Sequence, residues 1–459
     1  MAHTRRLSQS ITGRPERSGS INGVNPTAVT SAQASPEDVE TWLGHWQHTL
    51  VREIVDSRVV TVDANTSVED ACNILLSEDT PCLAVKSSEG QSVIGLFDFA
   101  DVNAFLTLAA TKHSILPDKL DSNPRVDEIF AAARAGHVPV HLVSNLSEKN
   151  PFETLPPDAT IISLLELFAR GSHRVLIPSA QDPNDFDGIV SDRSVLAWFA
   201  SFAEKTQSLQ VFLSNPLSSF SLPSLNLFSS VVAAISSETV LDAMKLMSEE
   251  GVSSVAVLEE GTGTLLSAVS VTDVGKVGRV VFYVHRSAKT SDKIVVPSES
   301  NQILSTPLHQ FISLIKLPKG SEDGVDQYPG LYPQTPQIVF SDQRSAVYSV
   351  LPSSTLLYTM QKILATNAHR VFVSGSPTSS PIMSPGSNLS GIVSVVDILS
   401  LFARLANVQD VDPTRMKRHR RASSVSSTRS SISDREPNLS RSNSSKSPGH
   451  IRRSSSVKH

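Results

Sequence analysis

Apolar residues along this chain follow a strand–helix–strand–strand–helix pattern that is clearest before the basic C-terminal tail. The expected elements there are a strand at 347–351, a helix at 355–368 and two β-branched runs at 369–373 and 391–396. Two such runs around a loop rich in Ser and Pro predict a β-hairpin. Asp397 then precedes an apolar helical run, a position where Asp is favoured as a helix N-cap.

The same order of elements occurs three more times. The strings His-Arg-Val and Gly-Ile-Val-Ser recur at matching places of the second copy, 173–175 and 188–191. The expected segments of the earlier copies are 57–62, 68–76, 81–85 and 93–101 in the first, 155–156, 161–169, 173–177 and 188–199 in the second, and 231–236, 240–247, 252–258 and 265–273 in the third. One supersecondary unit repeated four times predicts a repeat architecture.

These four units resemble CBS modules, small β-α-β-β-α domains that associate in tandem pairs. The resemblance implies an α+β fold with four modules in two pairs and disordered terminal tails. A four-module chain is similar to the γ subunit of the AMP-activated protein kinase. With its Ser-rich ends, this chain more closely resembles the fungal four-CBS stress and cell-cycle regulators that act on type 2A-like phosphatases.

That resemblance implies a non-enzymatic regulator that binds and restrains a type 2A-like protein phosphatase in stress or nutrient response and in cell-cycle or cell-separation control. The alternative is an adenine-nucleotide energy sensor that acts as a γ-like regulatory subunit of a protein kinase. No GxSxG, GxxxxGK[ST] or HExxH motif occurs in the sequence, and the repeats take up the ordered chain, so we do not expect an enzyme.

The expected organisation has six parts. They are a disordered tail at 1–34, an amphipathic helix at 35–55, a first CBS pair at 56–213, a crossover at 214–227, a second CBS pair at 228–407 and a basic, Ser-rich disordered tail at 408–459. The tails contain too few apolar residues to offset the entropy of ordering.

A helix is predicted to begin at Ser35, with Pro36 in its first turn. Its apolar stripe consists of Val39, Trp42, Leu43, Trp46 and Leu50. Such a stripe favours a helix packed on the first CBS pair over a free anchor for a partner. His45 and His48 beside the stripe have a spacing that a metal could use, but solvated side chains are the simpler interpretation.

Charge is distributed unevenly along the chain. From Pro413 onward there are twelve Lys and Arg against two Asp and Glu, a net +10, which leaves −15 for the rest of a chain whose formal charge is −5. The string at 417–421 is typical of nuclear import, so we expect a protein of cytoplasm and nucleus. Arg-rich contexts predict phosphorylation by basophilic kinases at Ser8, Ser423 and Ser454.

Other site classes find little support in the sequence. Cys72 and Cys82 form no CxxC motif, so we expect reduced core thiols and no metal site. No apolar run is long enough to span a membrane, and the first residues lack a secretory core. The basic tail has no interleaved aromatics for stacking on bases, so specific nucleic-acid binding is not expected. A homodimer is left open.

The resemblance also implies which residues would bind AMP, ADP or ATP, although no cofactor is required. An Asp after the last strand accepts bonds from ribose hydroxyls in the ligand-binding members, and a Ser three residues earlier contacts the ligand. The matching residues here are Asp101, Asp273, Asp397, Ser270 and Ser394, whereas module two has Ser194 in place of the Asp. His-Arg pairs that hold phosphate match His173–Arg174 and His369–Arg370, and modules one and three have 79–80 and 251–252 there.

Module four alone combines the His-Arg pair, the Ser and the Asp, so it is the expected nucleotide site. The competing interpretation is structural. Asp273 and Asp397 would cap helices without any ligand, and the His-Arg pairs would form ion pairs at loop edges.

Overall fold

The structure is a computed structural model that describes residues 32–89, 92–111, 124–182, 185–225, 231–275, 303–316, 348–374, 389–409 and 411. The predicted phosphorylation residues, Ser8, Ser423 and Ser454, lie outside the described residues, as do most of both predicted tails.

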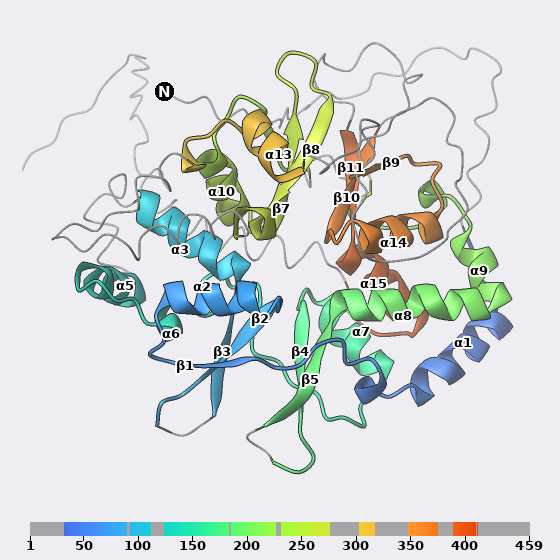
Figure 1. The fold of residues 1–459 in the computed structure, drawn as a ribbon. Helices are drawn as coiled ribbons and strands as arrows, with labels where there is room; N and C mark the ends of the chain where they lie inside the picture. Colours follow the sequence, from blue (N-terminus) through green and yellow to red (C-terminus); the bar gives the residue numbers. More distant parts are fainter. Residues whose placement is uncertain are drawn as a thin grey trace, which may run out of the picture.

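The α+β fold with CBS modules is confirmed, and the elements described for each module follow the predicted order, although module two has no first strand and no named helix directly follows the last strand of module three (Figure 1). Module one consists of β1 (Thr61–Asp63), α2 (Val68–Ser77), β2 (Cys82–Lys86), β3 (Val93–Asp98) and α3 (Phe99–Thr111). Module two consists of α7 (Ile161–Ala169), β4 (Arg174–Pro178), β5 (Phe186–Ser191) and α8 (Asp192–Lys205). Module three consists of β6 (Ala233–Ile235), α10 (Val240–Glu249), β7 (Ser254–Leu258) and β8 (Leu265–Ser270). Module four consists of β9 (Ser349–Val350), α14 (Leu356–Ala365), β10 (Arg370–Ser374), β11 (Leu389–Ser394) and α15 (Val395–Leu405).

The three-stranded sheets share one topology. Their first strand pairs in parallel with the second, and the second pairs antiparallel with the third. The sheet orders are β1-β2-β3, β6-β7-β8 and β11-β10-β9, while module two has β4-β5. A parallel bridge from Thr154 to Leu176 takes the place of the missing first strand in module two.

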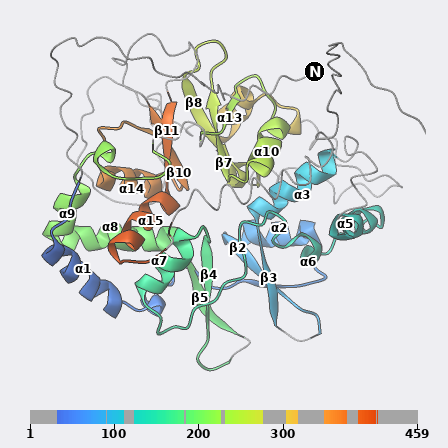
Figure 2. The same cartoon turned by 180° about the vertical axis from the view of Figure 1, so that it is seen from behind.

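The modules meet in two ways, as both views show (Figure 1, Figure 2). The sheets of the two modules in each pair pack against each other. Between modules one and two the small apolar cluster consists of Cys82, Ala84, Leu96, Leu176 and Ile189. Between modules three and four it consists of Ala256, Leu258, Ala268, Tyr348, Phe372, Leu389 and Ile392. Helices join module one to module three and module two to module four through two larger cores. The four modules therefore surround a common centre.

The core between modules two and four includes α1 (Pro36–His48). Trp42 and Trp46 of this helix are fully buried, and Trp46 meets Phe199 and Phe402 edge-on, at 5.1 and 5.9 Å between ring centroids. Phe199 and Phe402 stack at 4.0 Å across the module boundary. Ser35 is the N-cap, as predicted. The helix thus packs on the first pair, and it also reaches module four.

Segments between the modules cover the first helix of each module. The N-cap residue of that helix forms an isolated bridge in every case: Ser67 with Pro139, Thr160 with Leu50, Thr239 with Pro307 and Thr355 with Pro216. The helices and 3₁₀ turns beside these bridges are α6 (Val140–Val143), η1 (Val51–Glu53), α13 (Leu308–Lys316) and η3 (Leu217–Ser219), and the remaining helices are α5 (Pro124–Arg134) and α9 (Gln207–Leu213). Odd modules are therefore covered by a later segment and even modules by an earlier one.

The glycine of each Gly-Ile-Val-Ser string lies where another segment of backbone approaches the sheet. A Cβ on Gly391 would be 1.8 Å from the carbonyl oxygen of Leu225, and one on Gly188 would be 2.2 Å from Val55. The N–H groups of the following isoleucines donate to Ser224 (3.2 Å) and Ser57 (2.9 Å). The repeated glycines thus admit the segments that lead into modules one and three.

Candidate functional site

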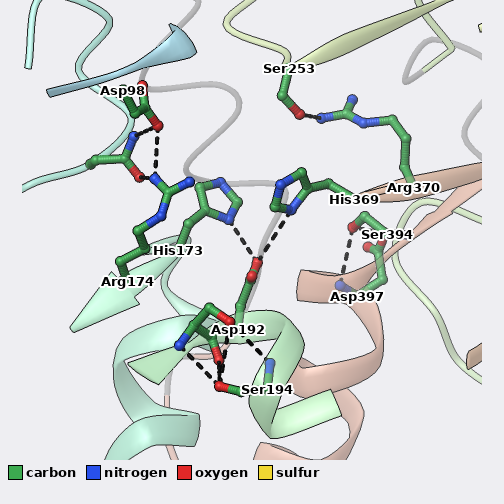
Figure 3. A network of polar contacts seen from close by, with 12 residues as sticks. Asp98, His173, Arg174, Asp192, Ser194, Ser253, His369, Arg370, Ser394 and Asp397 are labelled. Carbon is green, nitrogen blue, oxygen red and sulfur yellow. Dashed lines mark hydrogen bonds and ion pairs between the residues drawn. The ribbon is translucent and has the colours of Figure 1, made fainter. Parts of the chain in front are cut away.

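Two histidines from different modules face one carboxylate at the centre of the molecule (Figure 3). Asp192 Oδ2 lies 2.8 Å from His173 Nδ1 and 3.9 Å from His369 Nδ1. The two imidazole rings are 5.5 Å apart between centroids, and their planes are inclined at 62°. His173 and Asp192 belong to module two and His369 to module four, so this central triad spans the boundary between the two pairs.

The repeat explains this geometry. His173 and His369 precede equivalent strands, and the carbonyl oxygen of each accepts from the residue that begins the following helix, Asp192 or Val395, at 3.0 Å. Ser253 accepts the same bond from Val271 in module three. Asp192 is thus acidic where modules three and four have valine, and one carboxylate serves two histidines.

Burial and charge determine the protonation of the triad. The pKa of Asp192 is lowered, because His173, His369 and Arg174 more than offset the burial that would raise it. The pKa of His369 is lowered to about 3, chiefly because burial penalises the charged imidazole. Asp192 acts in the opposite sense, while His173, Arg193 and Arg174 add to the lowering. An ionised carboxylate therefore faces a neutral His369 at neutral pH.

Arg174 extends this network to module one. Its Nη1 donates to Asp98 Oδ2 at 2.7 Å and to Asn150 Oδ1 at 3.0 Å, while Asn150 Nδ2 donates to Asp98 at 2.5 Å. Burial would raise the pKa of Asp98, but the charge and hydrogen bond of Arg174 and two backbone N–H groups lower it overall. The predicted phosphate ligand Arg174 is thus already paired with a carboxylate.

Asp101 lies beside this ion pair and is fully buried. Its oxygens accept from the backbone N–H groups of Ser147 (2.9 Å) and Asp98 (3.2 Å). Burial and the adjacent charge of Asp98 raise the pKa of Asp101 to about 7. The predicted ribose acceptor of module one is therefore enclosed in protein.

Arg370 points away from the triad toward module three, where its Nη2 donates to Ser253 Oγ at 3.3 Å (Figure 3). In the same region, Lys149 Nζ donates to the Val252 carbonyl at 2.6 Å, which links module three to the connector of the first pair. The structure therefore separates His369 and Arg370, which the sequence analysis expected to act on one phosphate.

The sequence analysis predicted Asp397 as a helix N-cap, and this prediction is wrong. Ser394 is the N-cap, and Asp397 is the third residue of the helix. Asp397 Oδ2 accepts from the Ser394 N–H (2.9 Å) and hydroxyl (2.5 Å), while Oδ1 accepts from Ser224 Oγ (2.8 Å). The residue is 0% exposed. Its carboxylate thus already serves the capping box and the incoming segment.

Asp273 has the same place in module three but a different setting. It accepts from the Ser270 N–H (2.9 Å) and hydroxyl (2.7 Å) and is only partly buried. Ser194, its counterpart in module two, forms a capping box with Ser191. Of the predicted ribose acceptors Asp101, Asp273 and Asp397, Asp273 is therefore the one that is only partly buried.

The strand register corrects one correspondence made from the sequence. Arg174 and Arg370 pair with Ser191 and Ser394 as Cys82 pairs with Asp98 and Ser254 with Ser270. The His-Arg places in modules one and three are therefore 81–82 and 253–254, rather than 79–80 and 251–252. Each preceding helix is followed by one residue of positive φ: Asp79, Gly171, Gly251 and Asn367. Aligning these four residues restores the register.

Sequence reasoning missed Asp192, and it gave Asp98 and Asn150 no role in binding Arg174. The signal for Asp192 was its position directly after the Gly-Ile-Val-Ser string, where module four has an apolar residue. Asn150 lies in a connector and carried no recognisable pattern.

Nucleophilic chemistry has no support from the thiols. Cys72 and Cys82 are buried and form no disulfide, as predicted, and burial raises their pKa values to about 12 and about 11. Within the described parts of the chain, no helix has both the length and the apolar character needed to cross a bilayer.

A comparison with protein families identifies CBS domains in this chain. The CBS domain profile matches residues 51–107 and 228–277. Among solved structures, protein MJ1225 from Methanocaldococcus jannaschii aligns over 77% of this chain and 100% of its own, with 15% identity and a TM-score of 0.47.

Fungal relatives align over most of the chain. Protein sds23 of Aspergillus niger is 30% identical over 435 residues, covering 83% of this chain and 77% of the relative. Protein SDS23 of Yarrowia lipolytica is 28% identical over 442 residues, covering 92% and 79%. The chain therefore belongs to the Sds23 family of regulatory CBS-domain proteins.

Proposed function

We propose that this protein is a non-enzymatic regulator that binds and restrains a type 2A-like protein phosphatase in stress or nutrient response and in cell-cycle or cell-separation control. The phosphatase comes from the family resemblance. The observation that carries the regulatory part is the shared core: Phe199 and Phe402 stack across modules two and four, and α1 packs against both. A partner that contacts one module can therefore bias the positions of the others.

The proposal is tested by binding between purified components. The full chain is immobilised, and catalytic subunits of a type 2A-like and a type 1 phosphatase are passed over it. Selective retention of the type 2A-like subunit, at micromolar affinity or tighter, is expected. No retention, or equal retention of both subunits, would contradict the proposal.

A second candidate function is adenine-nucleotide sensing on behalf of a protein kinase. The observation that favours it is the partly exposed carboxylate of Asp273 in module three, together with Arg370, which reaches module three from module four. A carboxylate suits ribose because it accepts two hydrogen bonds, and Arg suits phosphate. The site so proposed differs from the module-four site expected from sequence, because Asp397 is enclosed.

We also propose that the basic tail directs the protein between cytoplasm and nucleus under control of phosphorylation at Ser423 and Ser454. Each phosphate would add about 1.5 to 2 negative charges and weaken the basic field. Replacement of both serines by alanine should alter nuclear accumulation during stress, measured by microscopy of a tagged full chain. Unchanged distribution would contradict this role.

A further inference from the structure

The central triad contains buried polar atoms that have no hydrogen-bond partner among the described residues. They are Asp192 Oδ1 and His369 Nδ1. Buried polar atoms in folded proteins are nearly always paired. A plain hydrogen-bonded triad would satisfy His173 through its 2.8 Å contact and leave the other two atoms unpaired. The geometry thus indicates a ligand that both atoms could bind.

We propose that His173, Asp192 and His369 bind a divalent transition-metal ion of the zinc class at the boundary between modules two and four. One donor atom from each residue lies within 4.8 Å of the other two. Metal–ligand distances of about 2.0–2.2 Å in a tetrahedral site place ligand atoms about 3.3 Å apart. The separations of 2.8 and 3.9 Å from Asp192 Oδ2 lie on either side of that value, so small side-chain movements would complete the site.

The donor set suits such an ion. Two imidazoles and one carboxylate are ligands that zinc accepts in protein sites, and three protein ligands leave a fourth position for water.

The carboxylate within the triad favours a cation over a phosphate. Asp192 would repel an anion placed between the two rings, and Arg174 is paired with Asp98 at 2.7 Å. Arg193 is a positive neighbour of His369, and the carboxylate of Asp192 is in turn a negative neighbour of Arg193.

Metal binding would connect the two pairs directly. His173 and Asp192 come from the first pair and His369 from the second, so the ion would bridge segments almost two hundred positions apart in sequence. An ion that binds the assembled form stabilises it by mass action. Occupancy would therefore set how firmly the pairs are held together.

The test uses the full chain after chelator treatment and dialysis. Zn²⁺ is titrated by calorimetry, and Co²⁺ serves as a visible-absorption probe of tetrahedral geometry. We expect the wild type to bind Zn²⁺ at this site and to melt at higher temperature with Zn²⁺. His369→Ala should lose at least about tenfold in affinity, together with the Co²⁺ bands and the thermal shift. The variant should fold without metal, since His369 Nδ1 makes no hydrogen bond to lose.

The matched control is the double variant His45→Ala/His48→Ala, which removes the other histidine pair considered from sequence, exposed on α1. Its Zn²⁺ affinity and Co²⁺ spectrum should equal those of the wild type. Equal metal binding by wild type and His369→Ala would overturn the proposal. So would inorganic phosphate binding to the metal-free chain that His369→Ala abolishes, because the triad would then be an anion site.

Discussion

Asp192 shows how one residue can turn a repeat into a site. Its counterparts in modules three and four are valines that begin the same helix, and the histidines before the equivalent strands differ little between modules two and four. A single acidic side chain therefore serves both histidines. Asp98 has a similar role toward Arg174, and its charge adds to the burial that raises the pKa of Asp101.

The pH dependence of stability should report on Asp101. Its folded-state pKa, about 7, lies above the ordinary value of 3.8. The folded state therefore holds this proton more tightly, and the stability that Asp101 contributes is complete below pH 4 and lost as pH rises through 7. The free energy of unfolding of wild type should fall relative to Asp101→Asn across that interval, as measured by denaturant titrations. Asp127→Asn, at an exposed position on α5, is the control. Parallel profiles for wild type and Asp101→Asn would contradict the assignment.

Nucleotide affinity should distinguish Asp273 from Asp397. Asp273→Ala should weaken AMP binding about tenfold, because two ribose hydroxyls would lose their acceptor at a cost of about 1 to 3 kcal/mol. Asp397→Asn, at the enclosed counterpart, should leave the affinity nearly unchanged. Arg370→Ala should weaken ATP and ADP more than adenosine. Calorimetry decides between these outcomes, and no heat with AMP, ADP or ATP at millimolar concentration would exclude the nucleotide-sensing function.

At the scale of elements, the helices and strands could be largely predicted from sequence, because their signals are local. Ser35 is the N-cap of its helix, as predicted. The spacing of apolar residues in α7 and α10 predicted the first and last residues of those helices to within two positions. Predictions failed where two nearby residues were both suited to one position, or where a contact joined segments far apart in the sequence. Asp is a residue type favoured at helix N-caps, so Asp397 was predicted to be one. Ser394 is the N-cap instead, because its hydroxyl accepts a hydrogen bond from the Asp397 N–H. The bridges that cover each first helix join distant segments, which periodicity cannot reveal.

Substitution of two glycines should have opposite effects. Gly391→Ala places a Cβ 1.8 Å from the Leu225 carbonyl oxygen, so the backbone must move, and we expect a loss of about 1 to 3 kcal/mol or more in the free energy of unfolding. Gly44→Ala lies within α1 with nothing within 4 Å of the new Cβ, and it should gain about 0.5 to 1 kcal/mol. Denaturant unfolding measures both. A neutral Gly391→Ala would mean that 224–225 does not pack against β11.

At the scale of the whole molecule, the two pairs form one body whose centre could not be predicted from sequence. His173 and His369 were each assigned to a phosphate site within a single pair, because a repeat is compared module by module. Their meeting depends on the packing of α7 and α8 against α14 and α15, which no local pattern encodes. The same packing buries Trp46 and explains why a helix before the first module contacts the last.

The junction should dominate stability. Phe402→Ala removes a fully buried ring stacked on Phe199 at 4.0 Å and should cost about 3 to 5 kcal/mol. Phe152→Ala, the matched control, removes a ring that is 39% exposed and contacts Phe186 at 6.2 Å, so about 1 kcal/mol is expected. Denaturant unfolding compares the two variants. Similar losses in the free energy of unfolding would contradict a core shared by modules two and four.

The most direct test of the central claim is phosphatase activity measured against increasing concentrations of the full chain. A type 2A-like catalytic subunit acting on a phosphopeptide should be inhibited to saturation by wild type and by Phe152→Ala. Phe402→Ala, which weakens the core between modules two and four, should inhibit at least about tenfold less well, if about 1.4 kcal/mol or more of the binding free energy depends on the assembled body. Undiminished phosphatase activity at saturating wild-type chain would contradict the account.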